Sequence, residues 1–185
     1  MLTAAVDAPA TTPAAAAPDF REVYRANVRA VWRALSALGV RGPDVADAAQ
    51  EVFLVVHRRL PEFDGRHKLS SWIHAICVRV ALATRRRAAS RRELPAETAG
   101  EPVAPGGPAE DLDARRAMES LRRLLDALDD DKRAVFVLYE VQELPMREVA
   151  EALGCPLQTA YSRYHAARKI IEQEVAARRA SQEKP

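Results

Sequence analysis

Apolar residues along this chain recur mostly with the 3.6-residue spacing of amphipathic helices, and runs of β-branched residues are scarce. Near the start, Val31, Leu35 and Leu38 share one helix face. Asp19 stands where the N-cap of that helix is expected. The spacing predicts seven helices, over about residues 20–38, 44–60, 71–87, 110–128, 132–141, 146–153 and 156–179. We therefore expect an all-α fold.

Proline and glycine divide this pattern into two blocks. The sequence AETAGEPVAPGGP, near residues 96–108, is too rich in both to form a regular element. The first 18 residues are mostly Ala, Pro and Thr, a composition typical of disorder. We therefore expect two small helical domains joined by a flexible linker. The expected segments are a leader (1–18), a first domain (19–92), an acidic linker (93–112), a second domain (113–179) and a tail (180–185).

The composition excludes several classes of protein. The 185-residue chain has no run of about 18 uncharged apolar residues, so no membrane span is expected. Its N-terminus lacks the basic residues of a secretory signal. Cys77 and Cys155 lie far apart without metal-ligand spacing, which suits a reducing compartment. The sequence therefore favours a cytoplasmic protein with no metal site.

The net charge of +2 conceals an uneven distribution. Residues 19–95 carry a net charge of +7, and residues 96–114 carry −5. Basic segments attract phosphate backbones without regard to sequence, so this pattern favours two modules that touch polyanions. Charged residues that merely solvate helix faces would give the same totals, and charge alone does not separate the two interpretations.

The most specific local pattern lies within residues 146–171 and fits a helix-turn-helix. Ala150 is small where two helices cross closely, Gly154 permits a left-handed turn, and Pro156 opens the second helix. One stripe of that second helix is expected to face inward: Ala160, Tyr164, Ala167 and Ile171. Its opposite, polar face suits a DNA major groove. An ordinary helical hairpin with a solvated face is the alternative.

Three short motifs in the first block sharpen this interpretation. They are Asp47-Ala-Ala-Gln-Glu-Val-Phe53, Leu60-Pro-Glu-Phe-Asp-Gly65 and Leu69-Ser-Ser-Trp-Ile73. Together they resemble the second conserved region of bacterial sigma factors. The helix-turn-helix, with residues 125–138 before it, resembles the fourth region. Both matches occur in family order without a third domain, so the chain resembles the compact extracytoplasmic-function (ECF) class over about residues 19–92 and 115–174.

This resemblance implies an alternative sigma factor, a subunit that binds core RNA polymerase, directs it to specific promoters and assists DNA melting. In the family, the Asp-x-x-Gln-Glu-x-Phe helix docks on the clamp helices of the polymerase β′ subunit. The implied polymerase-binding residues are therefore Asp47, Gln50 and Glu51. The fourth region is implied to meet the β flap. Simple helix capping is the alternative role for Asp47.

The loop from Phe63 to Trp72 corresponds to the family's −10 reading loop, which accepts a base flipped from the opened strand. Aromatic walls and nearby cations suit an unstacked base. The implied −10 residues are Phe63, Arg66, His67, Lys68, Trp72, Arg79, Arg85 and Arg86. Core packing is the alternative role for Trp72, and a solvated helix face is the alternative for the arginine run.

The second helix of the helix-turn-helix corresponds to the family's −35 recognition helix. The implied −35 residues are Gln158, Thr159, Tyr161, Ser162, Arg163, His165, Arg168 and Lys169. Tyr161 and Ala166 stand where family members commonly carry basic residues, which removes phosphate or guanine contacts. We therefore expect a −35 preference that differs from the commonest one of the class. Arg79 stands where family members carry an Asn, so the resemblance does not determine the preferred −10 sequence either.

The resemblance also implies partners. Members of the class are usually held inactive by a cognate anti-sigma factor, so one is expected here beside polymerase and promoter DNA. The acidic linker is implied to thread the polymerase channel, with a plain tether as the alternative. No cofactor and no small-molecule substrate are expected, and no enzyme, because the histidines pair with no nucleophile and no phosphate-binding glycine loop is present. His57 and His74 are expected at helix surfaces or edges.

Two other function classes stay open on the sequence. A stand-alone helix-turn-helix regulator would bind duplex operators as a dimer, but it leaves residues 47–53 and 63–72 unexplained. A helical interaction protein, such as an adaptor or an anti-sigma antagonist, would bind no DNA.

Overall fold

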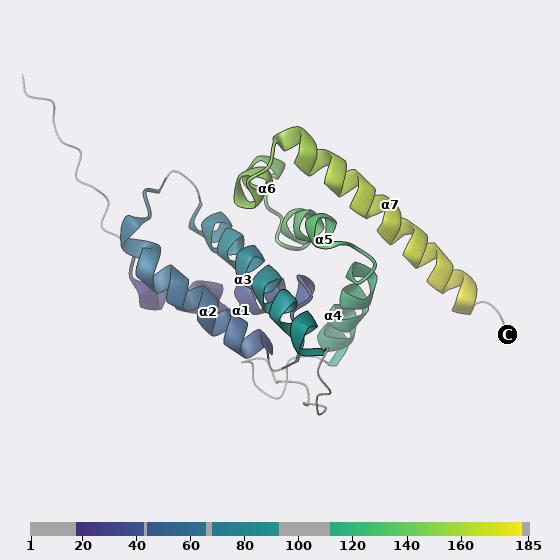
Figure 1. The fold of residues 1–185 in the computed structure, drawn as a ribbon, viewed down its shortest axis with the longest axis horizontal. Coiled ribbons are helices and arrows are strands. Elements are labelled where there is room, and N and C mark those ends of the chain that lie inside the picture. The colour runs from purple at the N-terminus through teal and green to yellow at the C-terminus, as the bar shows by residue number, and fades with distance from the viewer. Residues whose placement is uncertain (1–17, 43, 66–67, 93–111, 183–185) are drawn as a thin grey trace, which may run out of the picture.

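The computed structural model describes residues 18–42, 44–65, 68–92 and 112–182, and every regular element in those ranges is helical (Figure 1). The N-terminal half contains α1 (Phe20–Ala37), α2 (Asp44–Arg59), the short 3-10 helix η1 (Leu60–Glu62) and α3 (Leu69–Arg92). The C-terminal half contains α4 (Leu112–Leu125), α5 (Asp130–Phe136), η2 (Val137–Val141), α6 (Met146–Leu153) and α7 (Leu157–Gln182). The all-α prediction is confirmed.

Local sequence signals explain where helices begin and end. Asp19 caps α1, and its carboxylate accepts a hydrogen bond from the backbone amide of Arg21 at 3.2 Å. Gly154 ends α6 in the left-handed region, with φ of 63°. The next amide, that of Cys155, donates back to the carbonyl of Ala150 at 3.0 Å. These are the cap and the turn that the sequence predicts.

Some boundaries differ from the predicted ones. Helix α3 continues past the arginine run to Arg92. The helix predicted over residues 132–141 begins at Asp130 and finishes as the π-helical turn η2, in which the amide of Gln142 donates to the carbonyl of Val137 at 3.0 Å. The predicted linker, residues 93–112, lies outside the described residues except for its last one, and the leader does so except for residue 18.

Helix α3 lies between two layers of helices (Figure 1). It packs against α1 and α2 on one side and against α6 on the other. Between Ser71 and Ala81 only Arg79 is exposed and only Trp72 is half-buried, while the other side chains are buried. A helix that is buried all round needs neighbours on opposite faces. The buried residues of the two halves consequently form one continuous hydrophobic core.

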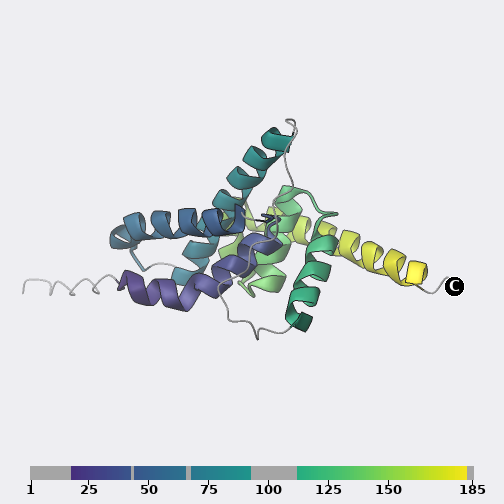
Figure 2. The ribbon, with the colours of Figure 1, turned by 90° about the horizontal axis from the view of Figure 1, so that it is seen from below.

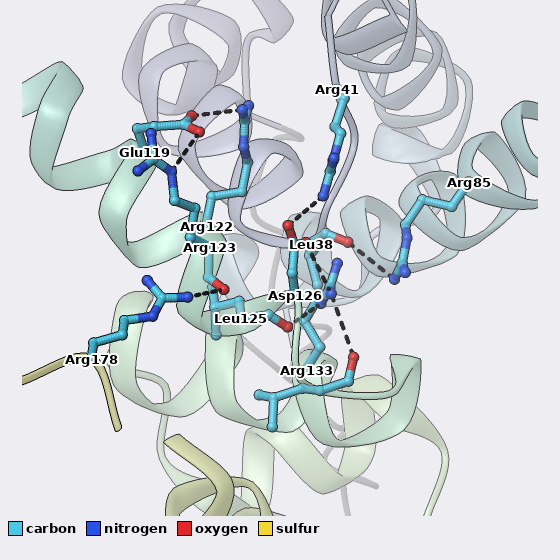
Figure 3. Close-up of polar contacts among 11 residues, drawn as sticks. Leu38, Arg41, Arg85, Glu119, Arg122, Arg123, Leu125, Asp126, Arg133 and Arg178 are labelled. Atoms are coloured by element: carbon cyan, nitrogen blue, oxygen red, sulfur yellow. Dashed lines mark hydrogen bonds and ion pairs between the residues drawn. The ribbon is translucent and has the colours of Figure 1, made fainter. Parts of the chain in front are cut away.

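A polar cluster completes the junction between the halves where α1 ends (Figure 3). Arg41 forms an ion pair with Asp126, and Arg85 forms one with Asp130. Arg85 also donates to the carbonyl of Leu38 at 3.5 Å. In both ion pairs the N-terminal half supplies the cation, and the anion comes from the α4–α5 turn (Asp126) or from the first residue of α5 (Asp130).

Arg133 lies at the centre of this cluster and is buried. Its guanidinium donates to the carbonyls of Leu125 at 3.0 Å and Leu128 at 3.4 Å, and it pairs with Asp126 at 3.3 Å (Figure 3). The same guanidinium lies so close to Gly39 that a Cβ atom there would stand 2.0 Å from its Nη1. Gly39 has φ of 90°, so both its conformation and its lack of a side chain are needed.

The ends of two helices project from the body. Seen from below, the last turns of α3 and of α7 extend beyond the packed centre (Figure 2). Arg178 in the last turns of α7 donates to the carbonyl of Arg123 on α4 at 2.9 Å. This bond ties the long helix α7 to the rest of the C-terminal half.

Candidate polymerase and promoter interfaces

The outer face of α2 carries part of the predicted polymerase site. Asp47 and Gln50 are exposed, whereas Val52 and Phe53 are buried, as the sequence indicates. Leu54 lies in the same row as Asp47 and Gln50, one to two turns further on, with half of its surface (50%) exposed. Leu54 was not predicted from the sequence, although a leucine that interrupts a polar helix face is a signal that the sequence contains.

Glu51 lies beside this row and turns towards α3. Its carboxylate accepts hydrogen bonds from the guanidinium of Arg87 at 3.2 and 3.4 Å. This pair raises the pKa of Arg87 through the hydrogen bond and the opposite charge. Glu51 is therefore engaged with a neighbouring helix, while Asp47 and Gln50 face outward.

The described part of the predicted −10 loop places two aromatic side chains together. The rings of Phe63 and Trp72 lie with their centroids 5.4 Å apart, and both side chains are half-buried. Lys68 is exposed beside them. Arg66 and His67 lie outside the described residues. The pair forms an apolar surface at the start of α3.

Helix α6 of the C-terminal half lies against this start of α3. Glu148 accepts a hydrogen bond from the hydroxyl of Ser71, and its other carboxylate oxygen is 3.8 Å from the ammonium of Lys68. Arg79 and Arg86 on α3 are exposed, whereas Arg85 is bound to Asp130 at the junction. The predicted −10 cations are thus divided between an open face and the contact with the C-terminal half.

His74 and Cys77 are buried in α3. The placement of His74 at a helix surface or edge was wrong, because α3 is covered on both sides, whereas His57 is exposed as expected. Neither ring nitrogen of His74 makes a hydrogen bond of good geometry. Burial lowers the pKa of His74, and the nearby polar groups of Gln142 and Ser70 raise that pKa by a smaller amount. Burial raises the pKa of the Cys77 thiol to about 12.

The helix-turn-helix is formed by α6, the turn at Gly154 and the first turns of α7. The predicted inward stripe of α7 is confirmed for Ala160, Tyr164 and Ala167, which are buried, and Ile171 is half-buried against the same core. The hydroxyl of Tyr164 donates to Glu140, and this bond together with burial raises the Tyr164 pKa. The inner face of α7 therefore packs this helix against the rest of the C-terminal half.

The predicted −35 residues on the outer face of α7 differ in their exposure to solvent. Six are exposed and two, Thr159 and Arg163, are half-buried. The exposed ones are Gln158, Tyr161, Ser162, His165, Arg168 and Lys169. Leu157, which was not among the predicted residues, is also exposed at the first position of the helix.

Several polar groups on this face are already bonded within the protein. The hydroxyl of Ser162 donates to the carbonyl of Thr159 at 2.9 Å. Arg163 pairs with Asp131 of α5, and Arg168 pairs with Glu172 at 2.8 Å. The rings of Tyr161 and His165 stack one turn apart, with centroids separated by 6.4 Å.

Within the described ranges, no group of three or more histidine, cysteine or acidic side chains is arranged to hold a metal ion. Among those same residues, no helix has the length and apolar character needed to cross a membrane.

Comparison with known proteins identifies both halves. Residues 23–91 match the family model for Sigma-70 region 2, and residues 118–171 match that for Sigma-70, region 4. The ECF RNA polymerase sigma-E factor of Escherichia coli K12 is 30% identical over 142 residues, which are 71% of this chain and 74% of that protein. The ECF sigma factor SigE of Mycolicibacterium smegmatis is also 30% identical, over 90% of this chain but only 65% of its own length.

Solved structures support the same fold. The sigma factor RpoE in complex with the anti-sigma factor NepR from Bartonella quintana superposes with a TM-score of 0.67 at 17% identity, covering 85% of this chain and 97% of that one. CnrH in complex with the cytosolic domain of CnrY gives a TM-score of 0.65 at 20% identity, covering 85% and 88%. Two region matches in family order and a relative matched over most of its length give one conclusion: the chain belongs to the ECF class of RNA polymerase sigma factors, the alternative sigma factors that direct polymerase to promoters.

Proposed function

We propose that this sigma factor docks on core RNA polymerase through the outer face of α2. The observation that carries the proposal is the exposed row of Asp47, Gln50 and Leu54, which combines a charge, an amide and an apolar side chain on one helix. An apolar contact surrounded by polar ones is the usual composition of a protein interface. Glu51 borders the row, and its bond to Arg87 holds α2 against α3. The implied partner is the pair of β′ clamp helices.

The test is binding of the purified chain to core polymerase. We expect the wild type to form a stable complex and Asp47→Ala/Gln50→Ala to lose at least about tenfold in affinity, since central interface residues carry most of the binding energy. Arg21→Ala/Glu22→Ala is the matched control, because both side chains are exposed but belong to α1 and not to the α2 row. Equal binding by both double variants would contradict the assignment. No binding by a folded wild type at low salt would favour a stand-alone regulator.

We further propose that the Phe63–Trp72 pair assists melting of the −10 element. An apolar aromatic surface at the start of α3 suits an unstacked base, Lys68 is exposed next to it in the sequence, and Arg79 and Arg86 supply exposed positive charge further along the same helix. Arg66 and His67 belong to the same proposal through their place in the motif. Phe63→Ala is expected to reduce open-complex formation, measured by permanganate reactivity of thymines, with little effect on binding to core polymerase. Unchanged reactivity would remove Phe63 from this role.

In this arrangement α6 lies against the start of α3, with Glu148 bonded to Ser71 and close to Lys68. While α6 is in this position, the carboxylate of Glu148 competes with a DNA phosphate for the ammonium of Lys68. We therefore place the separation of α6 from α3 before engagement of the −10 element. Arg85 is proposed to reach DNA only after its pair with Asp130 opens.

The −35 element is proposed to bind the outer face of α7, where Gln158, Tyr161, His165 and Lys169 are exposed. Thr159, Ser162, Arg163 and Arg168 border this face. The C-terminal half is further proposed to meet the β flap of polymerase. The polymerase performs the chemistry, and the chain contributes no catalytic group of its own.

Control by an anti-sigma factor is the remaining part of the proposal. One structural relative was solved with an anti-sigma factor bound, which supports a similar partner here. Co-expression of the chain with the product of an adjacent gene, followed by transcription assays, tests this. A partner that binds the sigma factor and leaves promoter-directed transcription unchanged would argue against it.

A further inference from the structure

We propose that Leu157 and Tyr161 read the methyl groups of thymines, so that the −35 element contains A·T base pairs at the positions these side chains face. This inference rests on the proposed role of α7 in binding the −35 element. It adds the type of base that the helix selects, and it names the two side chains that select it.

The exposed row at the start of α7 is apolar and aromatic. Leu157, Tyr161 and His165 follow one another at four-residue spacing, which places them in one row. The exposed fractions of Leu157 and Tyr161 are 38% and 43%. Only two other large apolar side chains of the described residues are as exposed, Tyr24 and Leu54, and both lie in the N-terminal half. The row therefore stands out on the C-terminal half.

The two arginines of the predicted −35 face are paired with acidic side chains of the protein. Guanine is usually read by an arginine or lysine that donates two hydrogen bonds to its major-groove edge. Arg163 is half-buried and paired with Asp131, and Arg168 is paired with Glu172 at 2.8 Å. Surface ion pairs of this kind are weak and do not prevent movement, but both guanidinium groups are directed at carboxylates of the protein itself.

The remaining side chains at the start of the helix fit A·T base pairs. The N-terminal residues of a recognition helix are those that contact base edges. Apolar side chains contact the thymine methyl group in the major groove, and a glutamine amide bonds to adenine through two hydrogen bonds. Leu157 and Tyr161 supply the apolar contacts, and Gln158, exposed between them, supplies the amide. The three residues together match the two bases of an A·T pair.

The ring of Tyr161 has an aromatic neighbour in the same row. It stacks on the imidazole of His165 with an interplanar angle of 20°. Tyr161 and His165 therefore present neighbouring, nearly parallel rings on the exposed row.

The test begins with holoenzyme made from the full chain and core polymerase. A pool of promoter duplexes with randomised −35 segments is selected by binding, and the selected sequence is expected to hold thymines within the segment. Each thymine is then replaced by deoxyuridine, which removes only the methyl group. Loss of one buried methyl is expected to weaken wild-type binding about fourfold at each position that is read.

Variants assign each position to a side chain. At one −35 position, Tyr161→Ala is expected to bind the thymine duplex and the deoxyuridine duplex equally well. At a different position, the same is expected of Leu157→Ala. Tyr161→Phe keeps the ring and should keep the wild-type ratio. Tyr24→Ala is the matched control, because Tyr24 is exposed to the same extent (42%) but lies on α1; it should leave every ratio unchanged.

The outcomes separate this inference from the proposed function. A selected −35 segment without thymines, or wild-type binding that does not change with deoxyuridine, overturns the reading of methyl groups and leaves promoter selection intact. A methyl effect that persists in both Tyr161→Ala and Leu157→Ala assigns it to other residues and overturns the proposal too. Failure of the chain to bind polymerase or to select any promoter overturns both.

Discussion

The two longest helices of this sigma factor, α3 and α7, are nearly equal in length but opposite in their surroundings. Helix α3 is buried on almost all sides between Ser71 and Ala81 because the C-terminal half covers the face that the N-terminal half leaves open. Helix α7 buries one stripe and keeps the other face exposed along its first turns. Burial thus determines which helix presents side chains to a partner directly and which does so only after the halves separate.

The largest expected effect comes from a charge placed on the covered face of α3. Ser71, Val78 and Arg85 follow at seven-residue spacing, and the first and last contact the C-terminal half, so Val78 faces it as well. Val78→Asp would bury an unpaired carboxylate, which costs about 3 kcal/mol or more. We expect a lower unfolding free energy or separated halves, measured by urea denaturation and small-angle scattering.

Arg79 provides the control for that variant, because it is the neighbouring residue and is exposed. Arg79→Asp is expected to change the unfolding free energy by no more than about 0.5 kcal/mol. Equal effects of the two substitutions would show that α3 is not covered by the C-terminal half in solution.

A second prediction concerns the close contact at the end of α1. Gly39→Ala would place a Cβ atom 2.0 Å from the Arg133 guanidinium and would strain a residue with φ of 90°. We expect a loss of about 2–3 kcal/mol in thermal or urea unfolding. Gly42 has φ of 58° but open space around it, so Gly42→Ala should cost only about 1 kcal/mol. If the two variants lose the same unfolding free energy, the contact with Arg133 adds nothing to the cost of Gly39→Ala.

A third prediction uses the buried imidazole of α3. Because burial lowers the pKa of His74, the unfolded chain binds this proton more readily than the folded protein does. The contribution of His74 is therefore fully present above the ordinary histidine pKa and is lost as the pH falls below it. Urea unfolding at pH 7 and pH 5 should show a smaller loss of stability for His74→Gln than for wild type. Parallel pH profiles would contradict this.

The smallest effects are expected from the ion pairs of the junction. Arg85 is about one-quarter exposed and also bonds to the Leu38 carbonyl, so Arg85→Ala is expected to cost about 1 kcal/mol. Arg41 is more exposed, and Arg41→Ala should cost less than about 0.5 kcal/mol. A double-mutant cycle with Asp130→Ala, repeated at high salt, measures the Arg85 pair. A cycle energy of zero would mean that this pair does not join the halves.

Most of the helices could be predicted from the sequence because their signals are local. Asp19 and Gly154 act through amides within a few residues, and the inward stripe of α7 follows from helical spacing alone. The motif residues Asp47 and Gln50 were placed correctly on an exposed face for the same reason.

The contacts between distant segments could not be predicted in this way. Arg85 and Asp130 are 45 positions apart, and Arg163 and Asp131 are 32 apart, so no spacing rule connects them. The burial of His74 depends on α6, which covers α3 only in the folded chain. An arginine or histidine in a predicted helix has the same local pattern whether it faces solvent or a second layer.

The contrast between the two cysteines gives the protein a built-in chemical probe. The Cys77 thiol, buried with a pKa of about 12, stays protonated and shielded from alkylating reagents while the fold is intact. Cys155 is partly exposed in the turn just before α7. A thiol-reactive fluorophore added to the unmodified chain should therefore label Cys155 first, beside the proposed −35 surface. The rate of the slower labelling at Cys77 then measures how often the structure around α3 opens.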